Sequence, residues 1–190
     1  MLLWVGLGNP GQEHAGQRHN IGFMALDAIA SRHGFSGWRK RFKGQVAEGH
    51  VGGVKIIALK PETYMNASGD AVQQAAAFIK APPAAIWAFH DELDLAPGKL
   101  RVKQGGGVAG HNGLRDMHRA LGSADFWRVR LGIGHPGHKD RVTGHVLGNF
   151  AKVETWVAPL LEAVAEAAPL LAAGQHEAFM TRVALLTPLE

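Results

Sequence analysis

Short apolar runs alternate along this chain with stretches in which apolar residues recur at helical spacing. The apolar runs predict strands over 2–7, 86–90, 99–103 and 127–133, and alternating runs on either side of Gly52-Gly53 predict a β-hairpin over 45–51 and 54–59. Helical spacing predicts helices from about 20 to 33, 67 to 80 and 112 to 121, the first with Asn20 as its N-cap. From about residue 151 one apolar face continues past Pro159 and Pro169, which predicts a helical tail with a kink or a break.

This order of elements predicts an α/β fold. We expect a single three-layer domain over residues 1–190, in which a twisted, mixed and mostly parallel sheet is flanked by helices. The chain contains no cysteine, which excludes disulfides, thiolate-held zinc, iron–sulfur clusters and a Cys nucleophile. No apolar stretch approaches the ~18 residues that span a membrane. We therefore expect a cytoplasmic protein.

Positive charge is concentrated in one part of the sequence. The whole chain has 20 Lys and Arg against 16 Asp and Glu, a net charge of +4 with neutral histidines. Residues 95–145 alone contain 9 basic and 3 acidic side chains, a net charge of +6. From charge alone, such a stretch leaves open both a polyanionic partner such as a nucleic acid and an ordinary basic surface that binds nothing charged.

Three familiar chemistries fit the motifs poorly. The run Gly6-Leu7-Gly8-Asn9-Pro10-Gly11 satisfies the spacing of a dinucleotide-binding loop, but no helix opens at its last glycine. His135 and His138 flank a Pro-Gly turn, which is not a rigid platform for metal ligands. No serine lies in a G-x-S-x-G elbow. Direct attack by water is the simpler chemistry, and it requires a general base, a group that orients the base, and donors for an oxyanion.

Polar residues that follow separate strands supply candidates for each of these roles. His19 lies at a loop-to-helix junction and fits the base, and Asp91 at a strand end fits its orienting partner. Asn9, Asn66 and Asn112 lie beside glycine or other small residues, where an amide can bind a substrate closely. The alternatives are a turn residue at Asn9, helix N-caps at Asn66 and Asn112, and residues without a catalytic role at His19 and Asp91.

Five ordered sequence blocks resemble the bacterial peptidyl-tRNA hydrolase family. They are Gly8-Asn9-Pro10-Gly11 with Arg18-His19-Asn20-Ile21-Gly22, then Lys60-Pro61-Glu62-Thr63-Tyr64-Met65-Asn66-Ala67-Ser68-Gly69, His90-Asp91-Glu92-Leu93-Asp94, Gly105-Gly106-Gly107 to Gly110-His111-Asn112-Gly113, and Gly132-Ile133-Gly134-His135-Pro136. The resemblance implies a monomeric esterase. It would hydrolyse the bond between a peptide and the 3′ ribose of tRNA without cofactor or metal.

The resemblance also implies a role for particular residues. His19 would be the catalytic base and Asp91 its partner, with Asn9 and Asn66 near the scissile ester and Asn112 ordering water or substrate. Tyr64, Met65 and His111 would line the same crevice, and His14, where the family usually has a tyrosine, would bring a further imidazole into it. The expected tRNA-facing patch consists of Lys99, Arg101, Lys103 and Arg130.

Two other classes of function stay open from the residues alone. A catalytically silent RNA-binding domain would share the basic surface, although the chain has no aromatic run typical of an RNA-recognition motif. A hydrolase of small esters or amides would share the water chemistry and would act on a substrate that lacks RNA.

Overall fold

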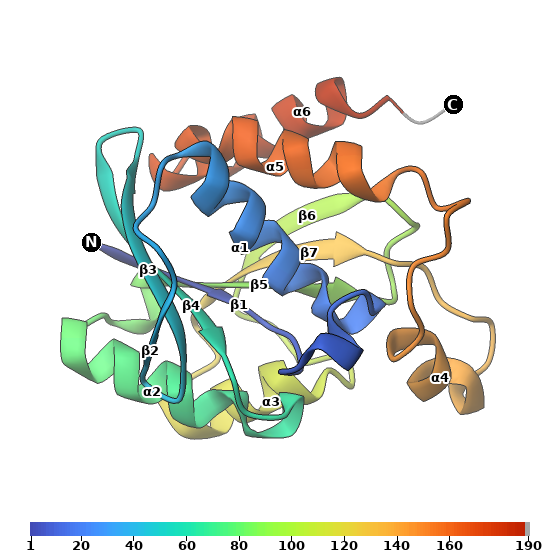
Figure 1. The fold of residues 1–190 in the computed structure, drawn as a ribbon, viewed down its shortest axis with the longest axis horizontal. Coiled ribbons are helices and arrows are strands. Elements are labelled where there is room, and N and C mark those ends of the chain that lie inside the picture. Colours follow the sequence, from blue (N-terminus) through green and yellow to red (C-terminus); the bar gives the residue numbers. More distant parts are fainter. Residues whose placement is uncertain (189–190) are drawn as a thin grey trace.

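The computed structural model describes residues 1–188 and contains one seven-stranded sheet with helices on both faces (Figure 1). The strands are β1 (Leu2–Gly6), β2 (Arg39–Arg41), β3 (Gly44–Val51), β4 (Val54–Pro61), β5 (Ile86–Glu92), β6 (Leu100–Gln104) and β7 (Trp127–Gly132). Their order is β2-β3-β4-β1-β5-β7-β6. Strands β4, β1, β5 and β7 run parallel, whereas β2, β3 and β6 join through antiparallel pairs. The expected mixed α/β sheet is confirmed, with its parallel part at the centre.

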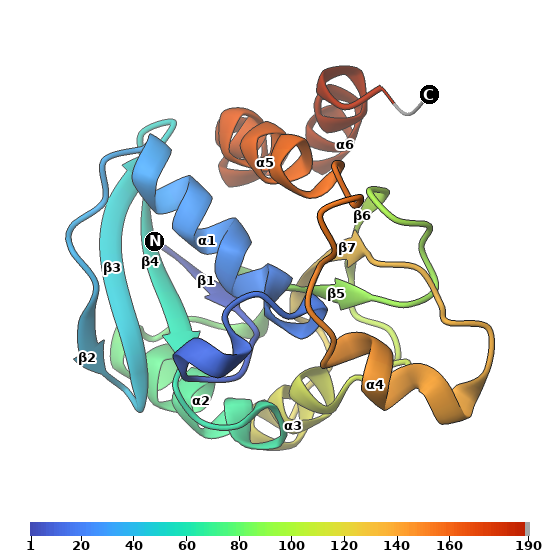
Figure 2. The same cartoon turned by 45° about the vertical axis from the view of Figure 1, so that its right-hand side comes forward.

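Helices form a layer on each face of this sheet. Figures 1 and 2 show α1 (Ile21–Arg32), α5 (Val157–Ala172) and α6 (His176–Leu186) on one face and α2 (Ser68–Ile79) and α3 (Asn112–Leu121) on the other. The short helix α4 (Val142–Val146) lies apart from both layers and contacts the turn that carries His19. Among residues 1–188, no helix combines the length and the apolar character that crossing a bilayer requires.

Alternation along the central strands builds two apolar cores. In β1, Leu3 and Val5 pack into the core under α2 and α3, while Trp4 packs into the core under α1 and α5. All three side chains are fully buried. The period of two in a strand sends neighbouring side chains to opposite faces, so both faces of β1 must be apolar.

A glycine lets α1 approach the sheet where the site lies. A Cβ on Gly22 would clash with the carbonyl oxygen of Phe89 and would lie 2.7 Å from the backbone nitrogen of Leu7, which is closer than van der Waals contact allows. No side chain fits there, so the first turn of α1 can lie directly against β5 and the residue that follows β1. This contact brings His19, just before α1, next to the carboxyl ends of these strands.

Several local predictions differ from the structure. The β3–β4 hairpin is confirmed, but β2, α4 and the short 3₁₀ turns were not predicted. Helix α5 continues through Pro169, and the chain breaks instead after Ala172, around Gly174 in the left-handed region (φ +77°). Asn20 precedes α1 but makes no capping hydrogen bond, because its side chain binds another loop.

Candidate active site

A cleft of about 410 Å³ opens beyond the carboxyl ends of β1 and β5. The strand order reverses at this point, since β1 pairs with β4 on one side and β5 on the other, and ligands of α/β sheets commonly bind there. The cleft is lined by eight of the residues expected from the sequence: Asn9, His19, Tyr64, Met65, Asn66, Asp91, His111 and Asn112. Its opposite wall comes from α4 and Leu147.

His19 and Asp91 form a buried hydrogen-bonded pair in the cleft. Nδ1 of His19 lies 2.9 Å from Oδ2 of Asp91, and both residues are more than nine-tenths buried. An ionised carboxylate can only accept, so Nδ1 carries the hydrogen and donates it. Nε2 is then the nitrogen with a free lone pair, which is the protonation state that a general base requires.

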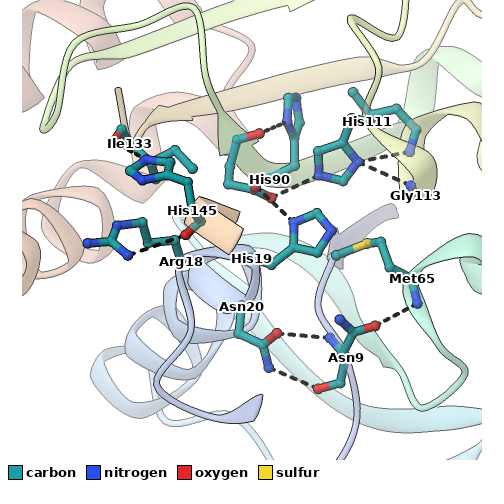
Figure 3. Close-up of polar contacts among 12 residues, drawn as sticks. Asn9, Arg18, His19, Asn20, Met65, His90, His111, Gly113, Ile133 and His145 are labelled. Atoms are coloured by element: carbon teal, nitrogen blue, oxygen red, sulfur yellow. Dashed lines mark hydrogen bonds and ion pairs between the residues drawn. The ribbon is translucent and has the colours of Figure 1, made fainter. Parts of the chain in front are cut away.

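A second imidazole occupies the other oxygen of the same carboxylate. Nε2 of His111 lies 2.9 Å from Oδ1 of Asp91, and its ring centre is 5.1 Å from that of His19 (Figure 3). His111 is also the N-cap of α3, because its Nδ1 accepts hydrogen bonds from the backbone nitrogens of Gly113 and Leu114. Nδ1 must therefore carry a lone pair and Nε2 the hydrogen. The backbone N–H groups at the N-terminus of α3 thus set the tautomer of His111, and the Nε2–H of His111 donates to Asp91.

These contacts shift two pKa values in the site. Burial by itself raises the pKa of Asp91, but the imidazoles of His111 and His19 outweigh it and hold the pKa well below its usual range. Burial also lowers the pKa of His90 to about 3, with the nearby His111 adding to the effect. His90 is 1% exposed and donates Nδ1–H to the carbonyl oxygen of Asp91 (2.8 Å). Asp91 is consequently ionised and His90 neutral at pH 7.

The amide of Asn9 is locked by two neighbouring segments. Its Oδ1 accepts from the backbone nitrogen of Met65 (2.7 Å), and its backbone nitrogen and oxygen bind the Asn20 side chain at 2.9 Å each (Figure 3). The amide oxygen is thereby occupied, which leaves the Nδ2 hydrogens of Asn9 as the group that can bind a substrate. Asn66 and Asn112 are exposed at the rim of the cleft.

The three residues at the centre of the site could also be metal ligands by residue type. His19, Asp91 and His111 offer ligand atoms within 4.8 Å of one another, the one such group that we find in residues 1–188. The imidazole nitrogens that face Asp91 both carry hydrogen in the arrangement described above. A metal ligand nitrogen must be free of its proton, so this hydrogen bonding competes with ligation.

Some expected residues lie elsewhere. His14, expected to enter the crevice, is not among the residues that line the cleft, and its Nδ1 lies 3.0 Å from Oε1 of Gln17. Lys99 and Arg101 line a separate depression between β6 and α6. Lys103 and Arg130 line a depression of about 290 Å³ that shares His90, Glu92, Val108 and Ala109 with the cleft.

Sequence reasoning missed three contributors to the site. His90 and Asn20 were present in the motif blocks, but no spacing rule predicts that the ring of His90 packs against that of His111 or that Asn20 binds Asn9. Arg18 was missed in the same way: it binds Glu154 (2.5 Å) and the carbonyl oxygen of His145 (3.3 Å), which ties α4 to the turn that carries His19.

The fold and the site together define an α/β protein with a buried His–Asp pair in a cleft at the carboxyl ends of its parallel strands. Residues 3–188 match the family described as peptidyl-tRNA hydrolase, and the chain belongs to this family. It is 71% identical to the peptidyl-tRNA hydrolase of Granulibacter bethesdensis over 98% of this chain and 97% of that protein. It is 70% identical to that of Acidiphilium cryptum over 98% of each chain.

Solved structures agree with this assignment. The crystal structure of peptidyl-tRNA hydrolase from Acinetobacter baumannii superposes with a TM-score of 0.92 at 40% identity, covering 100% of this chain and 97% of that one. The resemblance inferred from the five motif blocks is therefore confirmed.

Proposed function

We propose that this protein hydrolyses the ester bond between a peptide, or an N-blocked amino acid, and the 3′-terminal ribose of tRNA, with water activated by His19. The observation that carries the proposal is the buried hydrogen bond between His19 and Asp91 in the cleft. Membership in the peptidyl-tRNA hydrolase family supports the choice of substrate.

The reaction needs one base that later acts as an acid. Nε2 of His19 takes a proton from water while the water oxygen attacks the ester carbonyl carbon, and Asp91 stabilises the imidazolium that forms. The tetrahedral intermediate then collapses, the bond from carbon to the ribose oxygen breaks, and His19 returns the proton to that oxygen. The products are a free carboxylic acid and a tRNA with its terminal hydroxyl restored.

The asparagine side chains of the cleft bind the oxyanion of the intermediate and the backbone of the peptide. Asn9 presents only donor hydrogens, so it suits the oxyanion of the intermediate, which accepts hydrogen bonds and cannot donate them. Asn66 and Asn112 lie at the rim, where an amide that both donates and accepts can hold a peptide backbone or a water. Tyr64 and Met65 add apolar surface on the same side.

The tRNA is bound by the basic depression next to the cleft. Lys103 and Arg130 line the depression that shares residues with the cleft, and Arg130 is partly neutralised by Glu92 (2.8 Å). Lys99 and Arg101 extend the positive surface along β6. Phosphate contacts of this kind supply affinity that weakens with salt. The enzyme acts as a cytoplasmic monomer and requires no metal.

The decisive assay measures release of N-acetyl-amino acid from N-acetyl-aminoacyl-tRNA, with and without EDTA. We expect EDTA-insensitive cleavage, with little action on unblocked aminoacyl-tRNA. His19→Ala should lower turnover by at least about 10²-fold, whereas His118→Ala, at an exposed position of α3, should not. Binding of the tRNA without cleavage would show an RNA-binding protein instead. Rapid cleavage of a small ester that lacks RNA would show a hydrolase of another class.

A further inference from the structure

Arg128, in the middle of β7, is a buried arginine without an acidic partner. Its side chain is 0% exposed, and across residues 1–188 we find no carboxylate in ion-pair contact with it. The nearby carboxylate of Glu92 is paired with Arg130 instead. Burial and the charge of Arg130 lower the pKa of Arg128. A buried charge of this kind is costly, so its retention calls for a function.

The guanidinium of Arg128 joins two separate segments of backbone. One nitrogen, Nη1, donates to the carbonyl oxygen of Gly107, and the other, Nη2, donates to that of Ala124 (3.2 Å). The ring of Phe126 lies beneath it, 4.5 Å from the guanidinium carbon. A planar fork with fixed donors suits this geometry, whereas the single ammonium of a lysine does not.

The segment held in this way is the glycine-rich loop 105–110, which forms a wall of the cleft. Gly105, Gly106, Ala109 and Gly110 all have positive φ, between 47° and 98°. The loop has few side chains to pack, and glycines carry the largest conformational entropy to lose. Its first residue bonds to Phe126 through the backbone (3.0 Å). Within residues 1–188, Arg128 provides the hydrogen bond that ties the middle of the loop to the sheet.

The loop leads directly into the residues that act on the substrate. Val108, Ala109 and Gly110 line the cleft, and the next residue, His111, donates to Asp91 and caps α3. Asn112 follows at the rim of the cleft. A loop free to move would carry His111 away from the oxygen of Asp91 that it occupies.

We propose that Arg128 is a positioning residue for the hydrolytic reaction, which fixes loop 105–110 and through it His111 and Asn112. This inference rests on the proposed function. It differs from a role in tRNA binding, which the neighbouring Lys103 and Arg130 also suggest for the same depression. The two roles predict different kinetic effects, because a positioning residue acts on the bound substrate and a phosphate contact acts on binding.

The test compares Arg128→Lys, which keeps the charge, and Arg128→Met, which removes it, with the wild type on N-acetyl-aminoacyl-tRNA. We expect kcat to fall at least tenfold in both variants, with KM within about twofold and an unchanged dependence of KM on salt. Hydrogen exchange should be at least tenfold faster at the amides of 107–111. The matched variants Arg115→Lys and Arg115→Met, at an exposed site on α3, should leave all of these values unchanged.

Each of the following results would overturn the proposal. Normal kcat in Arg128→Lys would show that the charge alone matters. A change restricted to KM and its salt dependence would make Arg128 a phosphate contact, and unaltered exchange at 107–111 would show that the loop needs no tether. Should the variants fail to fold, rapid exchange of the Arg128 guanidinium hydrogens in the wild type, measured by NMR, would equally refute the hydrogen bonds. Neither exchange measurement requires hydrolytic activity. Failure of the proposed function can therefore be distinguished from failure of the proposed role of Arg128.

Discussion

Acid should destabilise this protein through His90, a buried imidazole that folding keeps neutral. In the unfolded chain His90 takes up a proton near pH 6.5, but in the folded protein its pKa is lowered to about 3. Between these values the unfolded state binds more protons, so the free energy of unfolding falls as the pH falls. His90 contributes its full stabilisation above pH 6.5 and loses it progressively toward pH 3.

The size of the effect follows from the two pKa values. At about 1.4 kcal/mol per pH unit, the interval from 6.5 to about 3 corresponds to about 5 kcal/mol in all, of which about 2 kcal/mol is lost between pH 7 and pH 5. The pKa of Asp91 is also lowered, but an aspartate lowers stability only when the pH falls below its usual range near 4. Measurement between pH 7 and pH 5 therefore excludes the contribution of Asp91, and comparison with a His90 variant isolates that of this imidazole.

Urea unfolding followed by tryptophan fluorescence at pH 7, 6 and 5 measures this change. The variant His90→Asn keeps a donor toward the carbonyl oxygen of Asp91 but cannot titrate, so it should be less stable at pH 7 and should lose about 2 kcal/mol less on acidification. His50→Asn, at an exposed position of β3, controls for the removal of a histidine. Equal pH dependence in His90→Asn and the wild type would refute the reasoning.

Three further changes test other parts of the structure. Asp91→Asn should lower kcat at least about 10²-fold with little change in KM, because an amide cannot stabilise the imidazolium; a wild-type rate would remove Asp91 from the reaction. Lys103→Ala should raise KM and reduce the log–log salt slope by about 0.7–0.9, unlike Lys40→Ala on the opposite sheet edge, and an unchanged slope would place the tRNA elsewhere. Gly22→Ala should cost about 3 kcal/mol or more in urea unfolding, since the new methyl meets backbone atoms on β5 and after β1. Gly37→Ala, where a Cβ meets nothing within 4 Å, is the control, and equal stability of the two variants would contradict the close approach of α1.

Local patterns were enough to predict most of the sheet and the helices on it. Runs such as Leu2–Leu7 and Ile86–His90 are apolar on both faces, which is what a buried parallel strand requires. Parallel strands place their carboxyl ends at one edge, so Asn9 and Asp91 were expected in one crevice from strand positions alone. Edge strand β2 and helix α4 are short and contain no buried residue, and they lack the apolar periodicity on which such predictions depend.

The assignment of helix caps shows where local reasoning fails. Asn20 and Asn112 are favourable N-cap residues by type, yet Asn20 binds Asn9 and the cap of α3 is His111. Propensity describes what a side chain does when only its own backbone is near. Here a partner 11 residues away for Asn20 and one 20 residues away for His111 offer hydrogen bonds that the local backbone cannot.

The class of fold, the family and the residue types of the cleft follow from local periodicity and from motifs that are continuous in the chain. Which groups meet depends on the folded chain: the second imidazole on Asp91, the locked amide of Asn9, the contact of His14 with Gln17, and the burial of Arg128. A hydrogen bond requires a particular distance and direction between atoms, and local patterns specify neither. His19 and Asp91 are 72 residues apart, and only the packing of α1 against the sheet brings them to 2.9 Å.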